Sequence, residues 1–492
     1  MTLLAFGYRY QRYSCQLLAR MFLIVFLVSG DGAAAGEYSP PGLYDMDFYN
    51  LDNGMSVVLK PRKGARTVAF RIRVDVGQLD YACGRQETPH FLEHLLFTGT
   101  RGHSESELDE AVEQHGGSWN AFTSPEETVY EMDIYSEYWT FGINTLYEIF
   151  SESLLSNDDV ETTRDIIIRE AGGAPSAAEQ WLRRNGIVQN ALTNTIQDLL
   201  PGSNLLCTES ESAEDITRED IINAYERYYV PGNMMLIAVG DFNPEKMRDV
   251  IKSTFGLLPA RTEPVSPRQH PSDPVVGDVV SSALDPVISG EATVGLAFRS
   301  IGHTSPDFYI MQVLEEYLST HIYNAIRIDE GLAYSPGSQQ YSLENYGVFL
   351  INADVDLDNM DAVLDLMHDE INKLVTDPPD DEEIMQTKRK LLLAMVQGHE
   401  SNSDIADYYV DASDELLLNG KLDDREARIE SVTPDDVHRV ASLYLAPGRT
   451  VVYQEAPTIT FDQLYTGLVM LILGGVVVII LVIKRHVAGY QG

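Results

Sequence analysis

Two stretches of this 492-residue chain repeat one pattern, and this repetition restricts the possible folds more than any other feature of the sequence. They begin at Thr217 and Thr433, which are 216 positions apart, and in each a Thr-x-x-Asp motif is followed by a Pro-Gly pair whose proline lies 14 residues after the threonine. Each stretch predicts a capped helix, a turn and a strand. An internal duplication of about two hundred residues is the simplest explanation.

The two halves also share a mixture of strands and amphipathic helices. The predicted strands are Ser56–Lys60, Thr67–Val76, Met234–Val239, Ala292–Phe298 and Thr450–Tyr453. The predicted helices are Glu105–His115, Trp139–Leu154, Asp158–Glu170, Asp307–Leu318, Met360–Thr376 and Asp380–His399. Clustered strands beside helix pairs, without βαβ alternation throughout, indicate an α+β fold. We expect two duplicated domains, each a mainly antiparallel sheet covered by helices.

Proline is dense between the halves, with five prolines from residue 259 to residue 274. This density breaks regular structure and predicts a linker. We therefore expect a first domain at 41–257, a linker at 258–280 and a second, homologous domain at 281–457.

A helix that begins near Pro89 carries the most chemically informative residues. Thr88 can cap this helix, and Pro89 fits its first position. His90, Glu93 and His94 fall together at i, i+3 and i+4, on a side away from the apolar residues. Two imidazoles one turn apart, with a carboxylate beside them, match the His-x-x-Glu-His order of inverted zinc hydrolases. A polar face with two incidental histidines is the alternative, which this spacing among only 11 histidines disfavours.

Only the first half carries this motif, because the corresponding stretch of the second half, 306–311, has no histidine pair. The second domain is therefore expected to have kept the fold without the metal. A catalytic zinc needs three protein ligands and one open position, so a third ligand must come from elsewhere. Glu161, Asp165 and Glu170 are candidates, and periodicity alone does not select among them.

The composition is strongly acidic, with a formal net charge of -40 and only 9 lysines among the 35 basic residues. Nucleic-acid binding through a basic surface is disfavoured. An acidic, lysine-poor surface suits a salty exterior, where self-repulsion is screened. A solvated acidic surface explains most of this charge, although a basic substrate remains possible.

The chain has three cysteines, of which Cys15 lies in a predicted targeting segment. Cys83 and Cys207 do not make a disulfide framework, and the sequence leaves open whether they pair in an oxidising compartment. For Cys83, a small buried thiol is favoured over a metal ligand.

The two ends predict an exported, membrane-anchored protein. Residues 1–35 predict a signal peptide, with early arginines, a short apolar run at 21–28 and an Ala-Ala-Ala cleavage site; an uncleaved anchor and a mitochondrial presequence are the alternatives. Residues 464–483 carry no charge and are long enough to cross a bilayer. The basic tail at 484–492 places that end in the cytoplasm, and hence the body in the periplasm or outside the cell.

The chain resembles the inverted-zincin family of pitrilysin, insulin-degrading enzyme and the mitochondrial processing peptidase over roughly residues 43–456. The motifs that carry the resemblance are His90-Phe-Leu-Glu93-His94, Phe97-Thr-Gly99-Thr100, Gly116-Gly117-x-x-Asn120-Ala121-Phe-Thr123 and Arg169-Glu170. The resemblance implies a zinc peptidase whose two-domain halves close like a clamshell. A chain of this short bacterial type supplies one half, so it would pair with a second copy or a related two-domain chain.

The resemblance also implies a role for each residue of the metal site. One zinc ion per chain would be held by His90, His94 and Glu170, with Glu93 as general base. Glu170 follows His94 by 76 residues, close to the family spacing. The family usually has a supporting Glu seven residues before the third ligand, where this chain has Thr163. Because such groups tune metal affinity and rate, turnover could be reduced.

Substrate-binding residues follow from the same resemblance. Asn120, Ala121 and Thr123 would lie on an exposed edge strand that binds the substrate backbone. Arg327 and Tyr334, in the second domain, would contact substrate and stabilise the oxyanion at the zinc site of the partner chain.

The sequence thus predicts a membrane-anchored zinc endopeptidase that acts on short or unfolded peptides. The alternative is a non-catalytic homologue that serves as a structural or partner subunit, but such members usually lose the His-Glu-His residues that this chain retains. A zinc-storing periplasmic protein would need neither Glu93 nor the Arg–Tyr pair.

Overall fold

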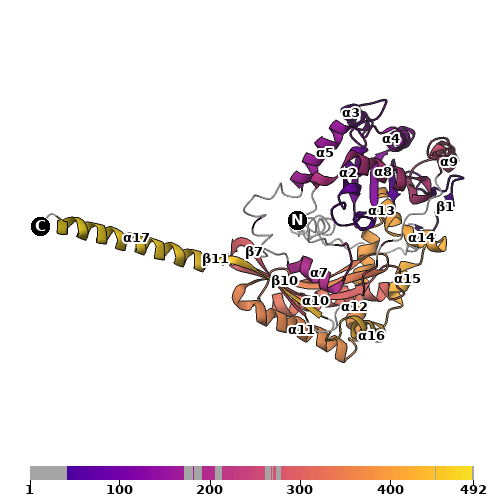
Figure 1. Cartoon of the computed structure of the whole chain (residues 1–492). Helices are drawn as coiled ribbons and strands as arrows, with labels where there is room; N and C mark the ends of the chain where they lie inside the picture. Colours follow the sequence, from indigo (N-terminus) through magenta and orange to yellow (C-terminus); the bar gives the residue numbers. More distant parts are fainter. Residues whose placement is uncertain are drawn as a thin grey trace, which may run out of the picture. The chain divides into compact units, whose positions relative to one another are not determined.

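The computed structural model describes residues 42–170, 181, 191–205, 213–260, 268, 270–272, 279–448 and 450–489. The predicted signal peptide (1–35), Cys15, Cys207 and most of the predicted linker (258–280) lie outside these residues. The chain divides into two compact units, each built on its own sheet (Figure 1). The first unit comprises 1–175, 209–268 and 394–423, and the second comprises 176–208, 269–393 and 424–492.

The first unit contains a six-stranded sheet in the order β1-β2-β6-β3-β5-β4. Its strands are β1 (Asp47–Asn50), β2 (Ser56–Pro61), β3 (Thr67–Val74), β4 (Ser118–Thr123), β5 (Thr128–Tyr135) and β6 (Met234–Gly240). Only β2 and β6 pair in parallel, and the other neighbours are antiparallel. Strand β4 therefore forms one edge of this sheet.

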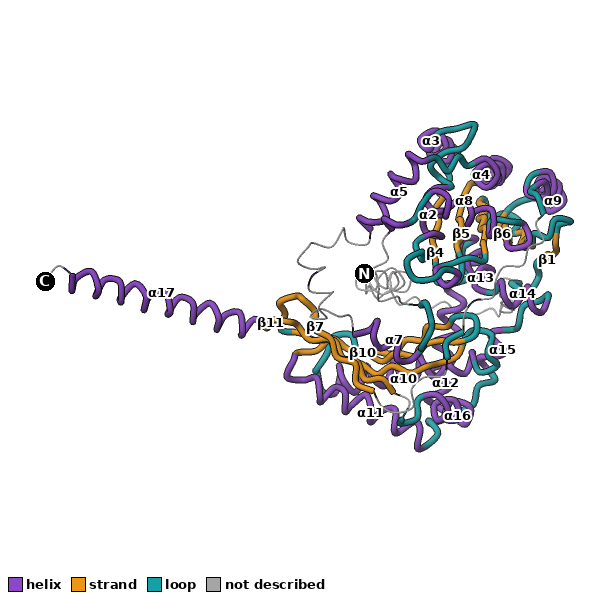
Figure 2. Tube along the Cα trace, in the orientation of Figure 1, coloured by secondary structure: helices purple, strands orange, loops and turns teal. Residues whose placement is uncertain are grey.

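Helices from the first half of the chain cover one face of this sheet (Figure 2). They are α2 (Thr88–Leu95), α3 (Glu105–Gln114), α4 (Trp139–Glu152), α5 (Asn157–Glu170), α8 (Arg218–Tyr228) and α9 (Pro244–Ser253). Alternate residues of β3, including Phe70 and Ile72, join Phe91 and Leu95 of α2 in one buried core. The pattern follows from the period of two in a strand, which sends alternate side chains to the same face.

The other face of the first sheet is covered by a segment from late in the chain. Helices α13 (Asn402–Asp411) and α14 (Ser413–Asn419) provide this cover, and Tyr409 is buried against the sheet. Arg71 of β3 is only 1% exposed and binds Asp407, 336 residues later, at 2.7 Å. Arg73, two residues further along β3, binds Asp414 at 2.9 Å. Buried charges are stable only when they are paired in this way.

The second unit repeats the topology of the first. Its five-stranded sheet has the order β7-β11-β8-β10-β9, with β7 and β11 parallel and the other pairs antiparallel. The strands are β7 (Val279–Ser289), β8 (Glu291–Ile301), β9 (Gly337–Ser342), β10 (Tyr346–Asp356) and β11 (Thr450–Thr460). This order matches β2-β6-β3-β5-β4 strand for strand. The predicted duplication and α+β class are therefore confirmed, with β1 as an addition to the first copy.

The helices of the second unit also come from both halves of the chain. They are α10 (Phe308–Tyr323), α11 (Met360–Thr376), α12 (Asp381–Gln397), α15 (Arg425–Glu430), α16 (Pro434–Tyr444) and, from the first half, α7 (Ala191–Leu199). Ile196 and Leu199 of α7 pack against Val348 and Leu350 of β10. Each copy thus contributes a helical segment to the sheet of the other copy. The prediction of two consecutive domains separated by the Pro-rich linker did not include this exchange.

The capping predictions have mixed outcomes. Thr217 and Thr433 each accept a hydrogen bond from the backbone at the third helical position, in complete capping boxes. Thr88 does not cap its helix, because α2 begins at Thr88 itself and Glu87 takes the N-cap position. The Thr88 hydroxyl is buried and donates instead to the carbonyl oxygen of Arg85 at 2.7 Å.

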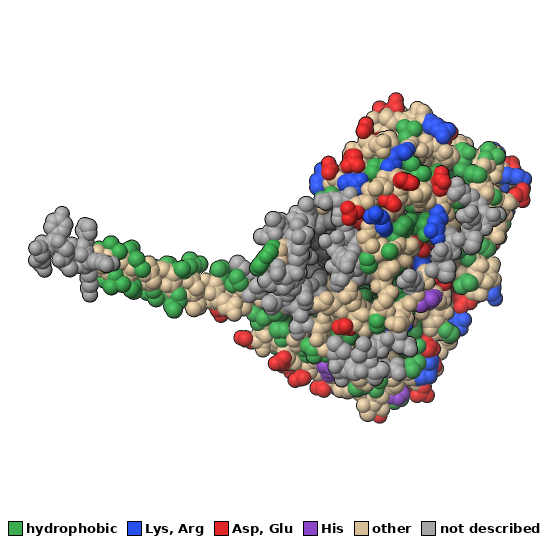
Figure 3. Space-filling model, in the orientation of Figure 1, with side chains coloured by type: hydrophobic (Ala, Val, Ile, Leu, Met, Phe, Trp, Pro, Cys, Tyr) green, Lys and Arg blue, Asp and Glu red, His purple; other side chains and the backbone are tan. Residues whose placement is uncertain are grey.

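Helix α17 (Phe461–Gly489) follows β11 without an intervening residue. Its part from Phe461 to Ile483 is long and apolar enough to cross a membrane, judged by length and composition, and includes the predicted span at 464–483. Hydrophobic side chains are exposed along it (Figure 3). The hydrogen bonds between Thr460 and Gln463 at its start, 3.1 and 3.2 Å long, form a reciprocal cap.

The buried ion pairs of β3 give a stability prediction. Arg71→Ala would leave Asp407 and Asp133 without their cation, so we expect it to lower the free energy of unfolding by about 3–5 kcal/mol. Arg248→Ala is the matched control, because its 2.7 Å pair with Asp47 is exposed and should contribute less than about 1 kcal/mol. Chemical denaturation of the full chain in detergent measures both, and equal losses would contradict the prediction.

Candidate metal centre

Helix α2 places the predicted metal-binding motif at the surface of the first unit. Phe91, Leu92 and Leu95 are at most 1% exposed and fix the helix in the core. His90 and His94 lie on the other side, and each side chain is 24% exposed. The 3.6-residue period of the helix therefore separates a packing side from a side with accessible ring nitrogens.

Three potential ligand atoms converge beside this helix. The Nε2 atoms of His90 and His94 are 3.2 Å apart. The Oε2 atom of Glu170, at the end of α5, lies 3.3 Å from Nε2 of His90 and 3.5 Å from Nε2 of His94. Ligand atoms about 2.0–2.1 Å from a tetrahedral zinc ion are separated by about 3.3 Å. The three atoms therefore fit a zinc ion, with one coordination position left open.

The structure distinguishes among the three acidic candidates on α5. Glu161 is directed to Arg164, at 3.3 Å. Asp165 is exposed, and among the described residues it forms no ion pair with either histidine. Of these three, Glu170 alone approaches both imidazoles, because it lies at the last position of the helix.

Glu93 belongs to the same group without joining the three converging atoms. One of its carboxylate oxygens lies within 4.8 Å of a ring nitrogen of each histidine. No ion pair connects Glu93 to His90 or His94 among the described residues. Glu93 is therefore close enough to contact either a metal ion or a water molecule at the site, although Glu170 lies nearer to both imidazoles.

The electrostatic surroundings favour a cation. Burial by itself lowers the pKa of His90, but a hydrogen bond to Glu87 and the charges of Glu93, Glu87 and Glu170 outweigh it, so the pKa is raised above its usual value. Carboxylates that stabilise an imidazolium would attract a divalent metal ion for the same reason.

Two contacts that the sequence did not reveal support α2. The carboxylate of Glu87 lies 2.9 Å from Nδ1 of His90. The i, i+3 spacing of these two residues could have indicated this contact from the sequence. The buried Tyr130 hydroxyl donates to the carbonyl oxygen of Leu92 at 3.1 Å and lies 2.9 Å from the hydroxyl of Tyr229. Tyr130 comes from β5, so no local pattern could have indicated its contact with α2.

Strand β4 carries the predicted substrate-binding residues. Asn120 is exposed, Ala121 is 8% exposed and Thr123 is half-buried. The strand is at the sheet edge and contacts α2. An edge strand next to the converging ligands offers unpaired backbone groups to an extended peptide.

Arg327 and Tyr334 lie together in the second unit. Arg327 is part of a π-helical turn, Asn324–Asp329, which extends α10. Its guanidinium carbon lies 4.9 Å from the centre of the Tyr334 ring, and Tyr334 is 77% exposed. A cation held over a solvent-facing phenol leaves both polar groups accessible.

Cys83 differs from its prediction as a buried thiol. It is exposed and disulfide-bonded, in the loop that precedes α2. The preference for the interior belongs to free thiols, so it does not apply to a disulfide-bonded cysteine. It is also excluded as a metal ligand, since only a thiolate can serve.

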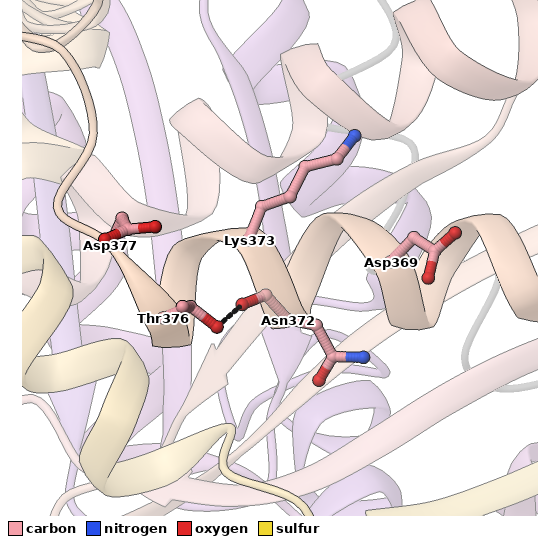
Figure 4. A pocket seen from close by; sticks show the side chains of 5 residues that line it. All are labelled: Asp369, Asn372, Lys373, Thr376 and Asp377. Carbon is pink, nitrogen blue, oxygen red and sulfur yellow. Dashed lines mark hydrogen bonds between the residues drawn. The ribbon is translucent and has the colours of Figure 1, made fainter.

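A shallow pocket on α11 contains none of the predicted site residues. Five side chains at helical spacing line it: Asp369, Asn372, Lys373, Thr376 and Asp377 (Figure 4). The Thr376 hydroxyl bonds back to the Asn372 carbonyl at 2.6 Å. This is a polar face of one helix, without converging groups that would indicate a ligand.

The converging ligand atoms predict zinc binding. The full chain in detergent should bind one zinc ion, and His94→Ala should weaken that binding more than about 100-fold, because a direct ligand matters more than a supporting group. His103→Ala is the control, since His103 bonds to Glu148 on the surface. Metal analysis after equilibration with buffered zinc measures both variants. Unchanged zinc content in His94→Ala would contradict the assignment.

Comparisons with known proteins identify the family of this chain. The family model described as "Insulinase (Peptidase family M16)" matches residues 56–206, and the model described as "Peptidase M16 inactive domain" matches residues 215–391. An uncharacterized zinc protease of Streptomyces coelicolor is 26% identical over 403 residues, which cover 80% of this chain and 85% of that protein. The mitochondrial-processing peptidase subunit beta of Lentinula edodes is 24% identical over 420 residues, with coverage of 80% and 86%.

Solved structures show the same fold. A protease from Helicobacter pylori matches with a TM-score of 0.73 at 20% identity, over 84% of this chain and 99% of that one. A peptidase M16 inactive domain from Pseudomonas fluorescens matches with a TM-score of 0.73 at 16% identity, over 85% and 99%. The two family models fall on the two halves of the duplication, and the converging ligands fall in the half matched as insulinase. The chain therefore belongs to the M16 family of peptidases.

Proposed function

We propose that this chain is a zinc-dependent endopeptidase that hydrolyses short or unfolded peptides. The observation that carries the proposal is the convergence of His90 Nε2, His94 Nε2 and Glu170 Oε2 at separations of 3.2–3.5 Å. Family membership and relatives named as zinc proteases support it.

The chemistry requires one acid–base group from the chain. Zinc bound by His90, His94 and Glu170 would polarise the scissile carbonyl and acidify a water molecule. Glu93 accepts a proton from the attacking water and delivers it to the leaving amine. One of its carboxylate oxygens lies within 4.8 Å of a ring nitrogen of each histidine, and this proximity supports the role.

The edge strand defines the substrate class. A peptide that adds to β4 must be extended over several residues, so a folded segment cannot be bound in this way. Asn120, Ala121 and Thr123 would contact this peptide. The proximity of β4 to α2 supports delivery of the added strand to the metal.

The second domain supplies oxyanion contacts in this proposal. Arg327 and Tyr334 donate hydrogen bonds to the negative charge that develops on the carbonyl oxygen. They act at the zinc site of a second chain, either another copy or a related two-domain protein. The contact between the Arg327 guanidinium and the exposed Tyr334 ring supports a shared role for the two side chains. The relative named as a subunit beta supports an assembly of two chains.

The proposed location is the outer side of a membrane. The signal peptide at 1–35 would direct export, and α17 would anchor the body with its C-terminus in the cytoplasm. The apolar length of α17 supports the anchor. The disulfide bond of Cys83 supports an oxidising compartment, where such bonds persist.

A non-catalytic subunit is the second candidate. The buried hydroxyl of Thr163, which has no hydrogen-bond partner among the described residues, is the observation that favours it. A subunit without activity has no need for three converging ligand atoms with a second carboxylate, that of Glu93, beside them, so the peptidase remains the better-supported function.

Replacement of the proposed base separates these functions. Glu93→Gln should keep zinc binding but lower the cleavage rate by about 10²–10⁴-fold, because the amide cannot accept the proton. Glu113→Gln, on the adjacent α3, is the matched control. Cleavage of a quenched fluorescent peptide and metal analysis are measured on the same samples. Equal cleavage by Glu93→Gln, or none by the parent chain, would exclude the proposed mechanism.

The phenol of Tyr334 provides a test of the second domain. Tyr334→Phe should lower kcat by about 10²-fold with zinc content unchanged, because one oxyanion donor is lost. Tyr323→Phe, a partly exposed tyrosine of α10, is the control. If both variants cleave at the parent rate, Tyr334 has no part in the reaction.

A further inference from the structure

Glu87 lies at the N-cap of α2 and contacts His90 of the proposed metal centre. We infer that Glu87 is a positioning residue that orients His90 for zinc, and that its carboxylate raises the metal affinity of this chain. The inference rests on the proposed zinc site and assigns a role to a residue outside the ligand set.

The two nitrogens of the His90 ring face different partners. Nδ1 lies 2.9 Å from Oε2 of Glu87, while Nε2 faces His94 at 3.2 Å and Glu170 at 3.3 Å. A neutral imidazole has one N–H, and a carboxylate accepts it at Nδ1. The lone pair then lies on Nε2, which is the nitrogen directed at the other two ligands. Glu87 therefore selects the tautomer that a metal requires.

The side chain of Glu87 is available for this task. It occupies the N-cap position of α2 but makes no side-chain capping bond. Its side chain is 27% exposed and that of His90 is 24% exposed, so the contact is partly shielded from water. Glu87 and His90 are three positions apart, with Thr88 and Pro89 between them, and Pro89 restricts the backbone. The contact is thus short, local and held by a rigid segment.

In the part of the chain that the structure describes, no second carboxylate shares this role. Among the described residues, the Nδ1 atom of His94 forms no hydrogen bond, so of the two histidines only His90 has a hydrogen-bond partner at Nδ1. On α5, two turns before Glu170, Thr163 is 1% exposed and its hydroxyl has no partner in the described part of the chain. Helix α5 therefore supplies a ligand but no supporting carboxylate at this position. Of the two imidazoles, only that of His90 is oriented by a carboxylate in the described part of the chain.

The contact has one competing explanation. A protonated His90 could simply form ion pairs with Glu87 and Glu170, as part of the packing of α2. In that case the loss of Glu87 would change the stability of the metal-free chain and leave zinc affinity nearly unaffected. The two explanations therefore differ in what they predict for the metal and for the fold.

The test uses the full chain in detergent, stripped of metal and titrated with Zn²⁺ against a chromophoric chelator. Glu87→Ala should weaken zinc binding by about 10–100-fold, the range for a supporting hydrogen-bond partner. Glu87→Gln retains an oxygen acceptor without the charge, so it should lose less than Glu87→Ala. Glu105→Ala, an exposed acid in the first turn of α3, is the matched control and should bind as the parent does.

Two further measurements separate orientation from folding. The thermal midpoint of the metal-free chain should be the same for Glu87→Ala and Glu105→Ala. The absorption bands of bound Co²⁺ should shift in Glu87→Ala and remain unchanged in Glu105→Ala, because they report ligand geometry.

The outcomes distinguish this inference from the function on which it rests. A parent chain that binds no zinc would remove the proposed function. A parent that binds zinc as tightly as Glu87→Ala would overturn only the role of Glu87. A lowered midpoint of metal-free Glu87→Ala, with unchanged Co²⁺ bands, would assign Glu87 to helix packing and also overturn the inference.

Discussion

The buried arginines of β3 are the constraint on which the first unit depends. The Arg71 guanidinium remains charged at any working pH, so the sheet can bury it only with carboxylates in place. Asp407 and Asp133 provide them, and Asp407 arrives on α13, 336 residues later. The same strand sends Phe70 and Ile72 to the opposite face, where α2 packs. Strand β3 thus binds the covering segment on one side of the sheet and positions α2, which carries the proposed metal site, on the other.

This arrangement explains why the histidines can be both accessible and fixed. Phe91 and Leu95 pack α2 into the core, and the Tyr130 hydroxyl of β5 donates a hydrogen bond to the Leu92 carbonyl oxygen. The ring nitrogens therefore lie at the surface, on a helix whose opposite side is buried in the core. Such placement would reduce the reorganisation needed for a metal ion to bind at the proposed site, so the scaffold would contribute to affinity as well as the ligands.

Local patterns in the sequence predicted much of this structure. The capping motifs at Thr217 and Thr433 revealed the duplication, and helix α11 has the predicted bounds, Met360–Thr376. His90 and His94 could be found because one helical turn brings them together. These features depend on residues that are close in the chain, where periodicity and capping chemistry act directly.

Features that depend on distant residues could not be predicted in the same way. Periodicity did not choose Glu170 over Glu161, because the choice depends on how α5 packs beside α2. The edge position of β4 required a family resemblance, since any strand of similar composition could be internal. The exchange of α7 and α13 has no local signal, because an amphipathic helix does not specify which of two similar sheets it will cover.

The exchange has a consequence for the order in which the protein can fold during synthesis. Val58, Ala69 and Ile237 lie on the first sheet under α13, where they are at most 1% exposed in the finished chain. The ribosome releases α13 only after most of the second copy, so this apolar face stays bare for much of translation. Contacts of such sequence separation form slowly. The second copy has no counterpart of His90 and His94, but loss of its α13 segment would expose the apolar face of the sheet that supports them.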